Sequence, residues 1–281
     1  MVSVSFAQKS NGGYPLSFLK VGLQEEIDEI VIDNPSIEDL RLEDSVREIN
    51  NQLFRVGVRI PVEINIDNFG TWDLLEDGTR VWRLKITSYN AKSITLLYDS
   101  FNLTSGCELF LYNDNRKQLL GSFNYNTNHT ETGKFSTQMI AGESTYLELN
   151  ISPECIEMPT IDIEGIIYNY RSVDGFVNYY YDGKETGFGS SGDCNPNVNC
   201  PEGYDWQNEK KGIALIFVID GFSAGFCSGS LINNTAFDGT PYFLTAEHCG
   251  GSVPAEDLAQ WQFYFNYEAV DCEDPVTEPS Y

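Results

Sequence analysis

The sequence predicts a mainly β fold, most clearly an antiparallel β-sandwich or jelly roll over residues 70–170. Three observations predict it. From Gly70 onward, short stretches of alternating apolar and polar residues recur. Clusters of turn-forming residues, such as 113–115 and 124–129, separate these stretches. Hydrophobic residues make up 41% of the chain and aromatic residues 13%, which is enough to fill a core.

The chain before the sandwich, residues 9–69, is predicted to be a separate amino-terminal segment. Opposite charges interspersed over residues 37–52 favour a helix, and alternation over residues 55–66 favours a strand. The strands expected in the sandwich cover residues 82–86, 93–96, 109–112, 119–123, 135–140, 146–149 and 161–168.

Residues 171–193 are rich in glycine and tyrosine and are interpreted as a linker. After Gly212 the pattern returns to β-structure, with strands expected over residues 213–219, 225–231, 242–246 and 261–267. A short helical turn is expected over residues 254–258.

Composition excludes some classes of function. The formal net charge is −25, from 42 acidic and 17 basic residues. Such a charge disfavours binding to nucleic acids and anionic membranes, both of which attract basic surfaces. No apolar run approaches the roughly 20 residues that span a bilayer. Residues 1–8 have small residues at Ser5 and Ala7, which fits the remnant of a signal peptide; a frayed terminus is the alternative.

The most informative stretch lies near the end of the sequence. It reads Cys-Ser-Gly-Ser-Leu from Cys227 and Leu-Thr-Ala-Glu-His-Cys-Gly-Gly from Leu244, so His248 directly precedes Cys249. Histidine has an unperturbed pKa of about 6.5, which suits a general base at neutral pH. The stretch resembles the histidine loop of trypsin-like serine endopeptidases.

A closer resemblance is to the bacterial lysyl endopeptidase group, and it covers about residues 187–281. Residues 194–203 resemble the group's mature amino-terminal segment. The stretch 261–267, followed by Cys272, resembles its next strand. The resemblance implies that residues 194–281 form an incomplete first barrel of the trypsin-like type, and that the sandwich before it is a pro-region.

The resemblance also gives meaning to the odd count of seven cysteines. It implies disulfides between Cys227 and Cys249 and between Cys200 and Cys272, and it leaves Cys194 unpaired in this chain. Cys107 and Cys155 either pair with each other or remain free thiols. Cysteine spacing and a total of two histidines argue against a metal site, and no cofactor is expected. Disulfides fit a secreted, extracellular or cell-surface location.

Catalysis of this type needs a nucleophile, a base and a carboxylate that orients the base. By resemblance, His248 is the base. The carboxylate follows the histidine by roughly 45 residues in the trypsin-like order and the serine comes later. Three aspartates, Asp257, Asp271 and Asp274, come too early for this role and are expected to be exposed tail carboxylates.

Other polar residues are not expected to serve catalysis. The Gly-Ser-Ser-Gly-Asp stretch at 189–193 looks like a nucleophile loop, but it precedes the histidine and is interpreted as linker. His129 is expected in a surface loop. Lys184 is the preferred maturation site, with an ordinary loop lysine as the alternative.

The sequence therefore predicts the amino-terminal part of a secreted serine endopeptidase precursor. It is expected to be inactive alone. Protein or peptide substrates are expected of a complete enzyme, and the resemblance implies cleavage after lysine. The oligomeric state is left open. The alternative is a secreted, non-catalytic binding or adhesion protein built on the sandwich with a remnant of the protease barrel. A carbohydrate-binding sandwich is a third hypothesis.

Overall fold

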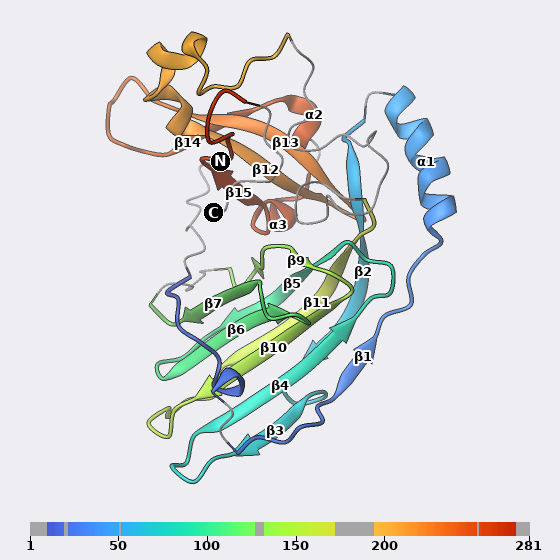
Figure 1. Cartoon of the computed structure of the whole chain (residues 1–281), viewed down its shortest axis with the longest axis vertical. Helices are drawn as coiled ribbons and strands as arrows, with labels where there is room; N and C mark the ends of the chain where they lie inside the picture. Colours follow the sequence, from blue (N-terminus) through green and yellow to red (C-terminus); the bar gives the residue numbers. More distant parts are fainter. Residues whose placement is uncertain are drawn as a thin grey trace. The chain divides into compact units, whose positions relative to one another are not determined.

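The computed structural model describes residues 10–19, 22–50, 52–126, 132–171, 194–251 and 253–273 (Figure 1). The expected signal-peptide remnant (1–8), His129, linker residues 172–193 with Lys184, and Asp274 lie outside the described residues.

Strands dominate the described chain, which confirms the mainly β prediction. The strands are β1 (Glu29–Val31), β2 (Arg55–Asn65), β3 (Thr71–Leu74), β4 (Arg80–Thr87), β5 (Ser93–Asn102), β6 (Cys107–Asn113), β7 (Leu119–Asn124), β8 (Phe135–Ser136), β9 (Ile140–Ala141), β10 (Ser144–Ile151), β11 (Thr160–Asn169), β12 (Ile213–Asp220), β13 (Ser223–Ile232), β14 (Tyr242–Thr245) and β15 (Gln262–Phe265). The helices are α1 (Ile37–Ile49), α2 (Glu247–Gly250) and α3 (Ala255–Leu258), with 3-10 turns η1 (Leu16–Phe18), η2 (Pro201–Trp206) and η3 (Glu209–Gly212). None of the helices in the described residues is long and apolar enough to cross a membrane.

The chain divides into two compact units, which do not follow the order of the sequence. The sandwich unit comprises Ser5–Pro35 and Arg59–Asn169. The histidine unit comprises the described residues of Ser36–Val58 and Tyr170–Tyr281. Residues 36–58, expected in a separate amino-terminal segment, therefore lie with the residues that carry the histidine motif.

The sandwich unit is built from two sets of paired strands. In one, β10 lies between β4 and β6 and pairs antiparallel with both, while β1 pairs parallel with β4 (Figure 1). In the other, β11 pairs antiparallel with β5, and the short strands β8 and β9 also pair antiparallel with β5. Aromatic rings fill the space between the sets: Phe101 stacks on Phe135 at 4.2 Å, and Phe123 of β7 meets Phe135 edge-on at 5.5 Å.

Two elements differ from the sequence-based expectation. The strand expected over 135–140 is split into β8 and β9. Between them, Thr137 makes two hydrogen bonds to Leu96: Thr137 N donates to Leu96 O at 3.1 Å, and Leu96 N donates to the side-chain Oγ1 of Thr137 at 3.3 Å in place of a backbone carbonyl. The helix expected over 37–52 ends at Ile49. There the Asn50 side-chain amide donates to Val46 O at 2.9 Å, which satisfies a terminal carbonyl.

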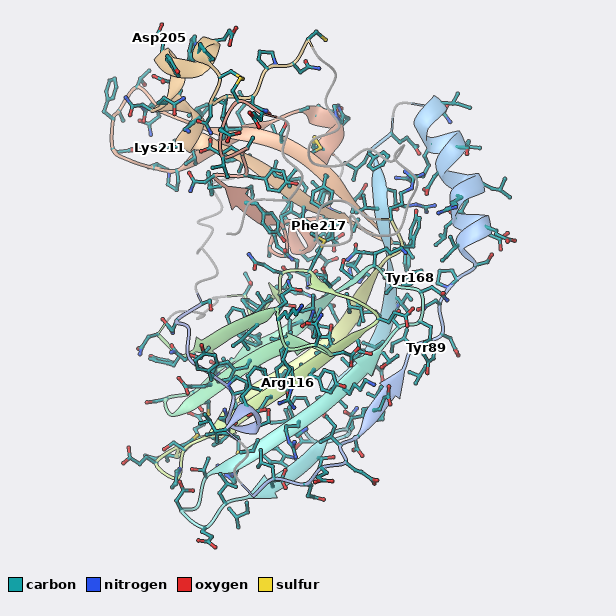
Figure 2. All side chains as sticks on the ribbon, in the orientation of Figure 1. Tyr89, Arg116, Tyr168, Asp205, Lys211 and Phe217 are labelled. Atoms are coloured by element: carbon teal, nitrogen blue, oxygen red, sulfur yellow. A yellow bond between two sulfur atoms is a disulfide. The ribbon has the colours of Figure 1, made fainter. Side chains whose placement is uncertain are left out.

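The histidine unit is organised around β12. This strand pairs antiparallel with β13 on one side and β15 on the other, and β14 pairs with the far end of β13. Side chains along β12 are buried almost continuously, as expected of a central strand. Among them, Phe217 (labelled in Figure 2) is fully buried and packs against Phe226 at 5.4 Å.

Candidate functional site

Two strands and a short helix hold His248. Gly229 pairs with Thr245, and Thr245 Oγ1 donates to Ser228 O at 2.8 Å, so the end of β14 is fixed to β13. A Cβ atom at Gly229 would lie 2.3 Å from the Phe243 ring and 2.5 Å from Leu244 O. Only glycine allows β14 to approach this closely, which explains the Cys-Ser-Gly-Ser pattern in physical terms.

The disulfide between Cys227 and Cys249 joins β13 to α2, with a Cα–Cα distance of 6.2 Å. His248 precedes Cys249 and is exposed. A ring nitrogen of His248 and the two sulfur atoms all lie within 4.8 Å of one another. Both sulfurs are used in the disulfide, and metal binding requires thiolates, so this cluster does not form a metal site in its oxidised state. The disulfide instead fixes the backbone on which the imidazole is presented.

Residues 188–280 match the family described as lysyl endopeptidase, C-terminal domain. The matched stretch holds β12 to β15, both disulfides and His248. This part of the protein is lysyl endopeptidase-like, which supports a protease-related function. No solved structure matches the chain.

A second disulfide, between Cys200 and Cys272, closes the other end of the lysyl endopeptidase-like stretch, and its cysteines are 72 positions apart in the sequence. Asparagines next to it add to the closure: Asn197 Nδ2 donates to Glu273 O at 3.1 Å and Asn199 Nδ2 to Ala269 O at 2.6 Å. Lys210 Nζ donates to Asn199 Oδ1 at 2.8 Å and to Glu268 Oε1 at 2.9 Å, which links the two residues.

Cys194, Cys107 and Cys155 are free in the structure. Cys194 is exposed. Cys107 and Cys155 lie next to each other in the sandwich unit, with their sulfur atoms 3.4 Å apart. The sequence left open whether these two cysteines form a disulfide or remain free, and in the structure they are free but neighbouring thiols.

The two described aspartates that follow the histidine in the sequence differ in their surroundings. Asp271 is exposed and accepts a hydrogen bond from Glu273 N at 3.0 Å. The expectation that Asp257 is exposed is wrong: its exposed fraction is 4%. Its Oδ2 accepts a hydrogen bond from Gly221 N at 2.8 Å, so α3 holds the turn between β12 and β13. A carboxylate buried this deeply needs such a donor.

Trp261 is a positioning residue that sequence reasoning placed in a strand without giving it a role. Its ring is 9% exposed, and its Nε1 donates to Ile219 O at 3.0 Å. The ring lies against Gly250, where a Cβ atom would be only 2.5 Å from Trp261 Cη2. The sequence feature that could have indicated this contact is the Cys-Gly-Gly after His248, since glycine in a crowded turn often marks a place where another residue lies close to the backbone.

Proposed function

We propose that residues 194–281 are the part of a secreted trypsin-like serine endopeptidase that carries its general base, His248. One observation carries the proposal: an exposed histidine is fixed beside the Cys227–Cys249 disulfide, within a stretch that matches the lysyl endopeptidase family. Substrates would be proteins or peptides. Cleavage after lysine is expected from the family alone.

In this proposal His248 accepts the proton of a serine hydroxyl as the serine attacks the scissile carbonyl, and then returns it to the leaving amine. A carboxylate would hold the other ring nitrogen. His248 is one of these three groups, and no serine or aspartate of this sequence stands at the position that the family's order requires. We therefore expect the 281-residue chain alone not to cleave peptides.

The test begins with the gene. We would express the protein from its complete gene and assay it on peptide substrates. The expected result is cleavage of lysyl peptides. His248→Gln should lower kcat by about 10³-fold or more, because the base is lost, whereas His129→Gln should leave kcat unchanged. A fully active His248→Gln enzyme would refute the proposal.

A second candidate function, non-catalytic binding by the sandwich unit, is favoured by a separate observation. A cavity of about 380 Å³ is lined by Tyr14, Tyr125, Asn124 and Asn150, among others. The two tyrosines are 71% and 51% exposed. Asn150 is 8% exposed, and its Oδ1 has no hydrogen-bond partner within the described residues. Exposed aromatic faces beside amide groups suit a neutral glycan, because sugars present both apolar faces and hydroxyls.

A glycan array would test this second function. Tyr125→Ala should abolish any binding observed, and Tyr89→Ala, which changes an exposed tyrosine outside the cavity lining, should not. No binding to any glycan, or equal effects of the two variants, would exclude it.

A further inference from the structure

One edge of β13 is shared by two strands. Residues 229–232 pair with β14, and residues 223–225 pair with the beginning of β2. In this second pairing Val58 lies opposite Ser223, Gly57 opposite Ala224 and Arg55 opposite Gly225. These partners are more than 160 residues apart in the sequence, yet both belong to the histidine unit. The opposite edge of β13 is taken by β12. Thus β2 covers the part of the edge that β14 leaves open.

The contact is closely fitted at Gly225. A Cβ atom there would lie 2.4 Å from Phe54 O and 2.8 Å from Leu53 Cγ. On the β2 side, Leu53 and Val56 are buried, and on the β13 side Ala224 is fully buried. Backbone pairing and burial therefore coincide at Ala224 and Gly225, as expected of a well-packed interface.

A buried polar network fixes the shape of the segment that supplies β2. Arg55 Nε donates to Asp44 Oδ1 at 2.7 Å, and Arg55 NH2 donates to Leu40 O at 3.0 Å, which ties β2 to α1. Tyr170 donates to Asp44 Oδ2 at 2.6 Å, while Tyr170 N donates to Val56 O at 3.2 Å. Asp44 is 1% exposed. The side chains of this network lie outside β13, so they hold the segment in the paired shape, while the backbone of Arg55 itself pairs with Gly225.

An unpaired strand edge attracts other extended chains, and an added strand binds mainly through backbone hydrogen bonds. We propose that Ser36–Val58 is an internal strand donor for the histidine unit: residues 55–58 occupy the edge of β13 and remain bound there after the chain is cut between residues 172 and 193. The partner of the β13 edge is thus a segment of the same chain. The proposal does not depend on catalysis, because pairing needs neither a nucleophile nor a carboxylate beside His248.

A cut chain provides the first test. A recognition sequence for a site-specific protease is inserted between Lys184 and Glu185, the full chain is cleaved, and the products are passed over a size-exclusion column. The two pieces should co-elute. Gly225→Ala should weaken their association at least 10-fold, because its Cβ meets Phe54 O. Gly212→Ala is the matched control, since its Cβ would have no neighbour closer than 3.7 Å. Separate elution of the unsubstituted pieces, or equal behaviour of the two variants, would overturn the proposal.

A cross-link tests the register independently of stability. Opposite residues in antiparallel strands have Cβ atoms about 4.5–5.5 Å apart. In a Cys194→Ser background, Val58→Cys with Ser223→Cys should form a disulfide that keeps the cut pieces together on a non-reducing gel. Val58→Cys with Ser230→Cys should not, because Ser230 lies seven positions further along β13 and pairs with Leu244. No cross-link in the first pair, or similar yields in both, would show that β2 does not occupy this edge.

Discussion

Two neighbouring glycines after the histidine, Gly250 and Gly251, have different surroundings. At Gly250 a Cβ atom would meet the buried Trp261 ring at 2.5 Å. At Gly251 it would meet Glu247 Oε1 at 2.5 Å, the end of an exposed and flexible side chain that can move away. The two positions therefore form a natural pair for testing how the histidine loop is supported.

We expect Gly250→Ala to lower the free energy of unfolding of the histidine unit by about 1–3 kcal/mol, because the buried ring must shift. Gly251→Ala should change it by less than about 0.5 kcal/mol. Urea denaturation followed by tryptophan fluorescence measures both. Equal losses for the two variants would contradict the packing described for Trp261.

The thiols should react in a fixed order. Burial raises the pKa of Cys107 to about 11, so little thiolate forms there near neutral pH. Cys194 is exposed and Cys155 is half-buried. Alkylation at pH 8, read by mass spectrometry, should modify Cys194 first and Cys107 last. Mild oxidation should join Cys107 to Cys155, whose sulfurs are 3.4 Å apart, and leave Cys194 as the one reactive thiol. Early modification of Cys107 would disagree with its burial.

At this scale, local motifs were enough to single out His248 and the cysteines, because the residues that define the histidine loop lie within a short stretch of sequence. The burial of Asp257 could not be predicted from a local motif. Its burial depends on Gly221, which lies 36 positions earlier and meets it only in the folded chain. The same holds for Trp261, whose partner Ile219 is 42 positions away.

At the scale of elements, alternation predicts strands well where one face is buried. It predicted a strand over residues 55–66, and β2 is found there. It could not predict that the first residues of β2 pair with β13, because pairing over such a distance leaves no local pattern. The parallel pairing of β1 with β4 was missed for the same reason.

The contact of η1 with β6 and β10 gives a prediction about alkaline pH. Ser17 Oγ lies 3.2 Å from the Tyr112 hydroxyl, and Ser17 N donates to Glu148 Oε1 at 3.1 Å. Burial, with Glu148 nearby, raises the pKa of Tyr112 to about 12. The folded state therefore holds this proton more tightly than the unfolded state. The resulting stability is complete below about pH 10 and is lost as pH rises towards 12.

We expect Tyr112 to account for a loss of about 1 kcal/mol in the free energy of unfolding between pH 9 and pH 11. Denaturant unfolding at the two pH values measures this loss. It should be smaller by that amount in Tyr112→Phe and unchanged in Tyr89→Phe, which alters an exposed tyrosine. An equal loss in the wild type and in Tyr112→Phe would refute the assignment.

At the scale of the whole molecule, the two units are stabilised by different means. In the sandwich unit the fully buried side chains include Trp82, Tyr98, Phe101 and Phe110, and its two cysteines are unbonded. In the histidine unit, disulfides cross-link the chain over 22 and 72 positions. Chain-entropy arguments give these closures about 3 and about 4 kcal/mol, respectively.

Reduction should therefore loosen one unit selectively. With reductant present, amide hydrogen exchange should rise in peptides from β12 to β15 of the histidine unit, because two cross-links no longer restrict its unfolded state. Peptides from β4, β10 and β11 of the sandwich unit should keep their protection, since no disulfide there is broken. Cys107→Ser is the matched control, because it removes a cysteine without removing either disulfide. Equal exchange changes in both units on reduction would show that the disulfides do not stabilise the histidine unit in particular.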